Sequence, residues 1–99
     1  MKPGTRLYSA VSDCEIVVVR PPATVVGVTC GGHPMVTDVA DAGDRDLPVD
    51  APGEAAIGKR YVHDGSGLEV LCTKAGAGQL AVDGQPLELL EARALPSSD

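Results

Sequence analysis

The chain of 99 residues contains, at residues 6–35, the sequence RLYSAVSDCEIVVVRPPATVVGVTCGGHPM. A second stretch at residues 59–87, KRYVHDGSGLEVLCTKAGAGQLAVDGQPL, presents the same features in the same order and at nearly the same spacing. In both, a basic residue and a tyrosine are followed by a glutamate with an apolar run and then by Gly-x-Pro. A repeat of this size predicts two copies of one supersecondary unit. The shared landmarks are Tyr8 and Tyr61, Glu15 and Glu69, and Met35 and Leu87.

The apolar segments of both halves have the composition of short strands. They are rich in Val, Ile and Leu, and they are separated by turn signals such as Pro21-Pro22, Gly31-Gly32 and Asp83-Gly84. We therefore predict an all-β fold of two β-meanders related by a pseudo-twofold. The expected strands are residues 6–11, 15–20 and 24–29 in the first half and 60–62, 68–73 and 79–82 in the second, while residues 87–94 form a final strand or one helical turn.

The repeat sets the predicted domain organisation. We expect a single domain over residues 1–99, with a first knuckle-like repeat at 6–35 and a second at 58–90. Residues 36–57 form an acidic connecting loop, and residues 91–99 form a tail that frays. A mobile cover, or a docking segment for a basic partner, is the alternative interpretation of the loop.

The composition limits how the domain is stabilised. The chain has no Phe and no Trp, so Val, Ile, Leu and Ala must build its core. A short chain buries a modest fraction of its surface, and pairing with another protein or a second copy would add to it. We therefore expect a protein partner or a homodimer.

Charge and hydropathy exclude two classes of partner. The net charge is −6, and the segment between Asp38 and Glu54 alone has six acids against Arg45. No basic patch for nucleic acid is present, and no run of about 18 apolar residues could span a membrane. The start of the chain lacks the apolar stretch of a signal peptide, and three cysteines suit a reducing compartment, so we expect a cytoplasmic protein.

The second half resembles the desulforedoxin family, the rubredoxin-like knuckle also found as the N-terminal domain of desulfoferrodoxin. That unit reads Tyr-x-Cys-x-x-Cys-Gly, a Glu/Val run, a glycine turn, and Leu-x-Cys-Cys-Gly-x-Pro-Met. This chain matches it at Tyr61, Gly67, Glu69-Val70, residues 74–78, Leu80 and residues 84–87. The resemblance implies a small β domain that pairs as a homodimer and binds iron or zinc through four cysteines.

The ligand positions of the second half depart from the family. The four cysteines fall on His63, Ser66, Val82 and Asp83. Tetrahedral iron or zinc requires thiolates, or thiolates with imidazoles, so we predict that this site holds no metal.

The first half keeps two cysteines. Alignment on Tyr8 places its first two ligand positions at Ala10 and Asp13, with Cys14 next to them, and its second two at Cys30 and Gly31. Cys14, Cys30, His33 and Asp13 are therefore the candidate metal ligands, for zinc or iron. The alternatives are two buried thiols without a cofactor, which we favour, or a disulfide between them. Cys72 is interpreted as a buried structural thiol.

Three functions remain open. The leading hypothesis is a non-catalytic accessory or protein-binding module on a degenerate desulforedoxin-like scaffold, without a cofactor. The second is a metal or redox protein that uses Cys14 and Cys30. The third is a small enzyme with a site between the repeats, built from His33, His63, Glu15 and Glu69.

Overall fold

The computed structural model describes residues 1–24, 26–43, 49–50 and 53–90, and it consists of antiparallel β-structure with one short 3-10 helix. The predicted all-β class is confirmed. None of the helices in the described part of the chain is long and apolar enough to cross a membrane. The elements are β1 (Arg6–Tyr8), β2 (Glu15–Arg20), β3 (Val28–Cys30), β4 (His33–Pro34), η1 (Val39–Asp41), β5 (Glu54–Ala55), β6 (Arg60–His63), β7 (Leu68–Lys74), β8 (Gly76–Ala77), β9 (Leu80–Val82), β10 (Gln85–Pro86) and β11 (Glu88–Leu90).

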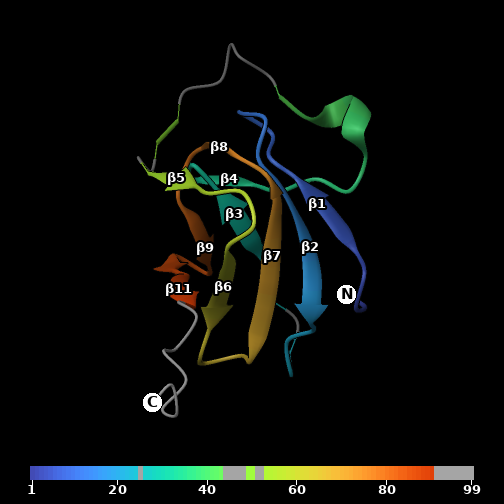
Figure 1. Ribbon diagram of the computed structural model, residues 1–99, viewed down its shortest axis with the longest axis vertical. Helices are drawn as coiled ribbons and strands as arrows, with labels where there is room; N and C mark the ends of the chain where they lie inside the picture. Colours follow the sequence, from blue (N-terminus) through green and yellow to red (C-terminus); the bar gives the residue numbers. More distant parts are fainter. Residues whose placement is uncertain (25, 44–48, 51–52, 91–99) are drawn as a thin grey trace, which may run out of the picture.

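The largest sheet has five strands in the order β1-β2-β7-β6-β11. Its two longest strands, β2 and β7, run side by side through the middle of the molecule (Figure 1). A second sheet has the order β10-β9-β3-β4, and β5 pairs with β8 in a third, two-stranded sheet. The first half of the chain thus supplies β1 and β2 on one side of the large sheet, and the second half supplies β7 and β6 on the other.

The strand pairings of the two halves share one register. Every residue pair between β1 and β2 recurs between β6 and β7 at one constant sequence offset; Tyr8 lies opposite Glu15, and Val62 lies opposite Glu69. The pairs between β3 and β4 recur in the same way between β9 and β10. Where the halves meet, Val17 of β2 lies opposite Leu71 of β7, its own equivalent in the second half.

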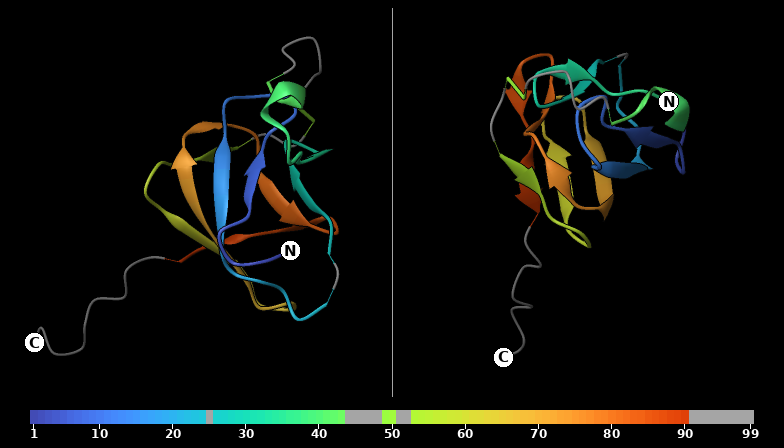
Figure 2. Two further views of the ribbon diagram at one scale, coloured as in Figure 1. Left: turned by 90° about the vertical axis from the view of Figure 1, so that its right-hand side faces the viewer. Right: turned by 90° about the horizontal axis from the view of Figure 1, so that it is seen from above.

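The core lies between the five-stranded and the four-stranded sheets, which are seen from two further sides in Figure 2. Alternate residues of each strand face inward, as the period of a β-strand requires. Ile16 and Val70 come from the first sheet and Val82 from the second, and all three side chains are fully buried. Small apolar side chains from both sheets therefore fill one continuous core.

Several strand predictions agree with the structure and others need correction. The runs at 15–20 and 68–73 form β2 and β7, and Asp83 and Gly84 have the positive φ angles of a tight hairpin turn. The strand expected at 6–11 ends at Tyr8, where residues 9–14 turn. The strand expected at 24–29 overlaps β3 at Val28 and Thr29, and residue 25 lies outside the described residues. The expected strand at the end of the chain is present as β11, whereas residues 91–99 lie outside the described residues.

The segment 36–57 was expected to be an acidic connecting loop, and the structure adds two short elements within it. It contains η1, capped by the Asp38 carboxylate, which accepts from the Ala40 N–H, and it contains β5. Because β5 pairs with β8, the end of this loop fastens the glycine turn of the second half. Asp44, Arg45 and Asp46, which contribute to its charge, lie outside the described residues.

The glycine turn that carries β8 packs closely on the first half. A Cβ atom at Gly76 would lie 2.8 Å from the Cα atom of Cys14 and closer still to its backbone nitrogen. A Cβ atom at Gly78 would lie 2.8 Å from the backbone nitrogen of Gly31 and 3.0 Å from Cys30 Sγ. Glycine is required at both positions because a backbone segment, which cannot move aside, occupies the space of any side chain.

We expect Gly76→Ala to destabilise the protein by about 2 kcal/mol or more, because the new methyl group overlaps the backbone at Cys14. Gly27→Ala is the control: its Cβ would have its nearest contact at 3.6 Å, to Asp83 Oδ1, so the effect should stay within about 1 kcal/mol. Urea unfolding of both variants measures the difference, and equal stabilities would show that β8 does not pack as described.

Candidate functional site

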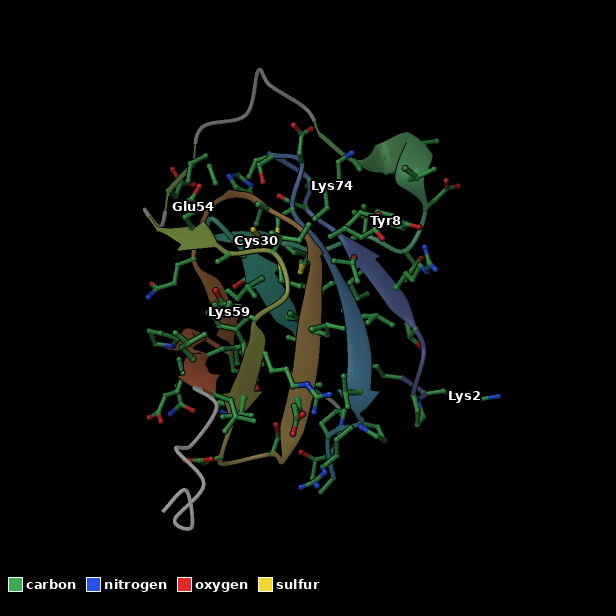
Figure 3. The ribbon with its side chains drawn as sticks, viewed as in Figure 1. Lys2, Tyr8, Cys30, Glu54, Lys59 and Lys74 are labelled. Atoms are coloured by element: carbon green, nitrogen blue, oxygen red, sulfur yellow. The ribbon has the colours of Figure 1, made fainter. Side chains whose placement is uncertain are left out.

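The three cysteines come together in the core. Cys14, Cys30 and Cys72 are each free and at most 1% exposed, and the Cys14 side chain interacts with both of the others. Cys14 immediately precedes β2, Cys30 ends β3, and Cys72 lies in β7, so the cluster joins both main sheets. Figure 3 shows sulfur atoms gathered beside Cys30. The expectation that Cys72 is a structural thiol did not include this proximity.

The hydrogen bond between Cys14 and Cys30 separates their acidities. It lowers the pKa of Cys30 to about 7, with Ser9 and Ser12 contributing in the same direction against the effect of burial. The same hydrogen bond, together with burial, raises the pKa of Cys14 well above its usual range. Burial also raises the pKa of Cys72. When protonated, Cys30 has the carbonyl oxygens of Ala77 and Gly78 as acceptors, at 3.5 and 3.7 Å.

The first knuckle turn, residues 9–14, is organised by two serines. Ser9 is fully buried, and its Oγ accepts from the backbone N–H groups of Val11 and Ser12 at 3.1 and 3.0 Å. Ser12 Oγ accepts from the Cys14 N–H at 3.2 Å and donates to the Ala77 carbonyl at 2.7 Å. The serine hydroxyls thus satisfy backbone donors that would otherwise be unpaired next to the core.

The second knuckle turn, residues 63–68, repeats these bonds. His63 Nδ1 accepts from the Ser66 N–H at 3.2 Å, and Ser66 Oγ accepts from the Leu68 N–H at 3.3 Å. Since Nδ1 is an acceptor in this geometry, the imidazole proton is assigned to Nε2, which donates to Gln85 Oε1 at 2.7 Å. The ring of His63 is therefore held in one tautomer at both of its nitrogens.

These bonds align the two halves differently from the sequence. Ser9 and Ser12 make the bonds that His63 and Ser66 make in the second half, whereas the sequence alignment had placed Ala10 and Asp13 opposite them. The sequence alignment matched the two tyrosines, whereas in the sheet Tyr8 corresponds to Val62. The signal that could have found the correct frame is the equal spacing of the ion pairs Arg6–Glu15 and Arg60–Glu69.

The donor set at these positions does not fit the iron or zinc of the desulforedoxin family. The first half offers Ser9, Ser12, Cys30 and Gly31, which contain a single thiol, and the second half offers no thiol. Both serine hydroxyls and His63 Nδ1 are already engaged with backbone N–H groups. Within the described residues, no group of three or more His, Cys, Asp or Glu side chains is arranged to hold a metal ion.

The structure brings part of the predicted ligand set together. Cys14 interacts with Cys30, and His33 of β4 lies opposite Cys30 of β3, with its Nε2 atom 3.3 Å from Asp50 Oδ2. Asp13 lines a hollow of about 250 Å³ with Cys14, Lys74 and Val39. The four residues remain a prediction as metal ligands, and the geometry favours the thiol pair within them.

The residues of the enzyme hypothesis do not form one site. Glu15 lies opposite Lys74 and Glu69 lies opposite Arg20, at the two ends of the β2–β7 pair. Each carboxylate forms an ion pair with an arginine of the neighbouring strand, at 3.6 and 3.2 Å. The two glutamates therefore link strands in equivalent positions of the two halves.

A second hollow of about 300 Å³ lies beside the second knuckle turn and is lined by His63, Asp64, Gln85 and Glu88, among others.

No protein family, no curated protein and no solved structure matches this chain.

We expect Ser9→Ala to cost about 1–3 kcal/mol of stability, because it leaves the Val11 and Ser12 N–H groups without their acceptor. Ser9→Cys, which restores a weak acceptor of similar shape, should recover part of the loss when measured in reductant. Urea unfolding followed by circular dichroism gives both values. An unchanged midpoint for Ser9→Ala would refute the role assigned to this hydroxyl.

Proposed function

We propose that this protein is a non-catalytic accessory module that binds another protein, built on a desulforedoxin-like scaffold that folds without metal. The serine and histidine acceptors in the two knuckle turns support this proposal. These side-chain atoms accept hydrogen bonds from backbone N–H groups of each turn, so these N–H groups are satisfied without a metal centre.

We further propose that the module is an internal duplication with a pseudo-twofold axis between its halves. The constant spacing of strand pairs supports this, since equivalent residues meet where the halves join: Val17 opposite Leu71, and Thr29 opposite Ala81. A single chain would then supply both halves of the homodimer that the family resemblance implies.

The binding surface is assigned to the outer edge of β11, and this edge carries the proposal. An unpaired strand edge presents N–H and C=O groups to which another chain can add a strand. Among the described residues no strand pairs with the outer side of β11, and Leu89 on this strand is 44% exposed.

The other edges of the two main sheets are less available. Tyr8 of β1 already exchanges two backbone hydrogen bonds with Val36, each of 2.8 Å. The edge strands β4 and β10 contain Pro34 and Pro86, which have no N–H to donate. By this comparison, β11 is the edge best suited to strand addition.

The proposed partner is a protein segment that adds to β11 in extended conformation, with an apolar side chain against Leu89. A basic residue would suit Glu88, which neighbours Leu89 and is also exposed. The proposed compartment is the cytoplasm, since all three thiols are free.

Leu89→Lys should remove the bound partner, because a charged side chain opposes strand addition at an edge. We expect at least about a tenfold loss of the co-purifying protein in quantitative affinity purification, with urea stability within about 0.5 kcal/mol of wild type. Val39→Lys is the matched control, since Val39 is 67% exposed on η1 and far along the chain from β11.

The proposal fails if Leu89→Lys and Val39→Lys recover the same proteins as wild type. If light scattering finds a dimer that Leu89→Lys converts to a monomer, the segment added to β11 belongs to a second copy.

Metal content is a separate test of the scaffold. Protein purified without a histidine tag should contain far less than stoichiometric zinc and iron, and a chelator should leave its unfolding midpoint unchanged. Stoichiometric metal that is lost in Cys14→Ala or Cys30→Ala would instead support the metal-binding hypothesis.

A further inference from the structure

The three cysteines of the core cluster do not have equivalent contacts, and the proposed accessory function does not involve them. Cys14 hydrogen-bonds with Cys30 and also with Cys72, so it is the thiol shared by the cluster. Among these three described side chains, Cys30 and Cys72 do not hydrogen-bond to each other. Cys14 thus lies within reach of both Cys30 and Cys72, whereas these two thiols are not hydrogen-bonded to each other.

The cluster is buried but has an approach from the surface. Cys14 forms part of the wall of the 250 Å³ hollow between the start of β2 and η1, together with Asp13, Lys74 and Val39. On another side, the glycine turn lies against Cys30, whose Sγ is 3.5 Å from the Ala77 carbonyl. A small polar molecule could reach Cys14 through the hollow, whereas the turn covers Cys30.

We propose that Cys14 and Cys30 form a reversible redox pair, which hydrogen peroxide entering by this hollow converts to a disulfide, with Cys72 as the alternative partner of Cys14. The geometry selects Cys14 as the attacking sulfur because it borders the hollow. It selects Cys30 as the resolving sulfur because the two side chains are hydrogen-bonded.

The attacking sulfur must be a thiolate. The hydrogen bond between the two cysteines lowers the pKa of Cys30 and raises that of Cys14, so the pair loses its first proton from Cys30. A proton must therefore pass from Cys14 to Cys30 before Cys14, the sulfur that borders the hollow, attacks the peroxide.

The chemistry balances with peroxide as the oxidant. The Cys14 sulfur attacks one peroxide oxygen and breaks the O–O bond, giving a sulfenic acid, while the thiol proton and the departing hydroxide form water. The Cys30 sulfur then attacks the sulfenic sulfur, the S–O bond breaks, and the second thiol proton leaves with the hydroxide as water. Two thiols lose two electrons in total, and one peroxide becomes two waters.

A disulfide between Cys14 and Cys30 would join the start of β2 to the end of β3, and so link the two main sheets covalently. A cross-link of this kind restricts the unfolded chain. Oxidation should therefore raise the urea concentration at the unfolding midpoint without changing the fold.

The test treats the reduced full-length protein with hydrogen peroxide in small molar excess, under non-denaturing conditions. We expect denatured samples to show a fall from three reactive thiols to one, and intact mass to fall by two hydrogen atoms. Peptide mapping without reductant should find Cys14 joined to Cys30, and dithiothreitol should restore all three thiols.

Three variants separate the roles. Cys14→Ala should form no intramolecular disulfide, because it removes the shared thiol, whereas Cys72→Ala should form the Cys14–Cys30 bond as wild type does. Cys30→Ala should form the Cys14–Cys72 bond instead. Circular dichroism and urea unfolding check that each variant folds.

The proposal is overturned if all three thiols of wild type survive peroxide, or if oxidation stops at Cys14 as a sulfinic or sulfonic acid. A Cys30–Cys72 bond in peptide mapping would contradict the shared role of Cys14. These readings come from wild-type protein, so they hold even if Cys14→Ala does not fold. They are also independent of whether Leu89→Lys loses a binding partner.

Discussion

The antiparallel pairing of β2 with β7 is the constraint on which the rest of the structure depends. Val17 lies opposite Leu71 at its centre, and this register turns Ile16, Val18 and Val70 into the core. Strand β1 then pairs with the outer side of β2, and β6 pairs with the outer side of β7. The second sheet packs against the core-facing side of this sheet. The same register places Cys72 opposite Ile16, which follows closely on Cys14, and this is why thiols distant in sequence meet.

The turns at residues 9–14 and 63–68 show how different side chains can hold two equivalent turns. A tight turn points several backbone N–H groups at one place, and each buried N–H requires an acceptor. In this chain Ser9, Ser12 and Ser66 provide hydroxyl oxygens, and His63 provides an unprotonated ring nitrogen. The acceptors are internal to each turn, so the protein itself satisfies these N–H groups.

The sequence predicted the parts of the fold that depend on local pattern. The β-branched run 15–20 and the run 68–73 became the central strands, and Asp83-Gly84 became a hairpin turn. The two-residue strands β4, β5, β8 and β10 were not predicted, because so short a strand has no periodicity to recognise. The alignment of the halves was shifted by a single position in the first strand, since tyrosine identity was weighted above the spacing of Arg6 and Glu15 from Arg60 and Glu69.

The sequence by itself determined that this is an antiparallel β protein with a core of small apolar side chains and two similar halves. These properties follow from composition and from the period of each strand, which are local. Only the tertiary structure decided that Ser9 and Ser12 are equivalent to His63 and Ser66, that Cys72 joins Cys14 and Cys30, and that β11 is an open edge among the described residues. Each of these depends on register between strands far apart in the chain, and a shift by a single position would turn each side chain to the opposite face.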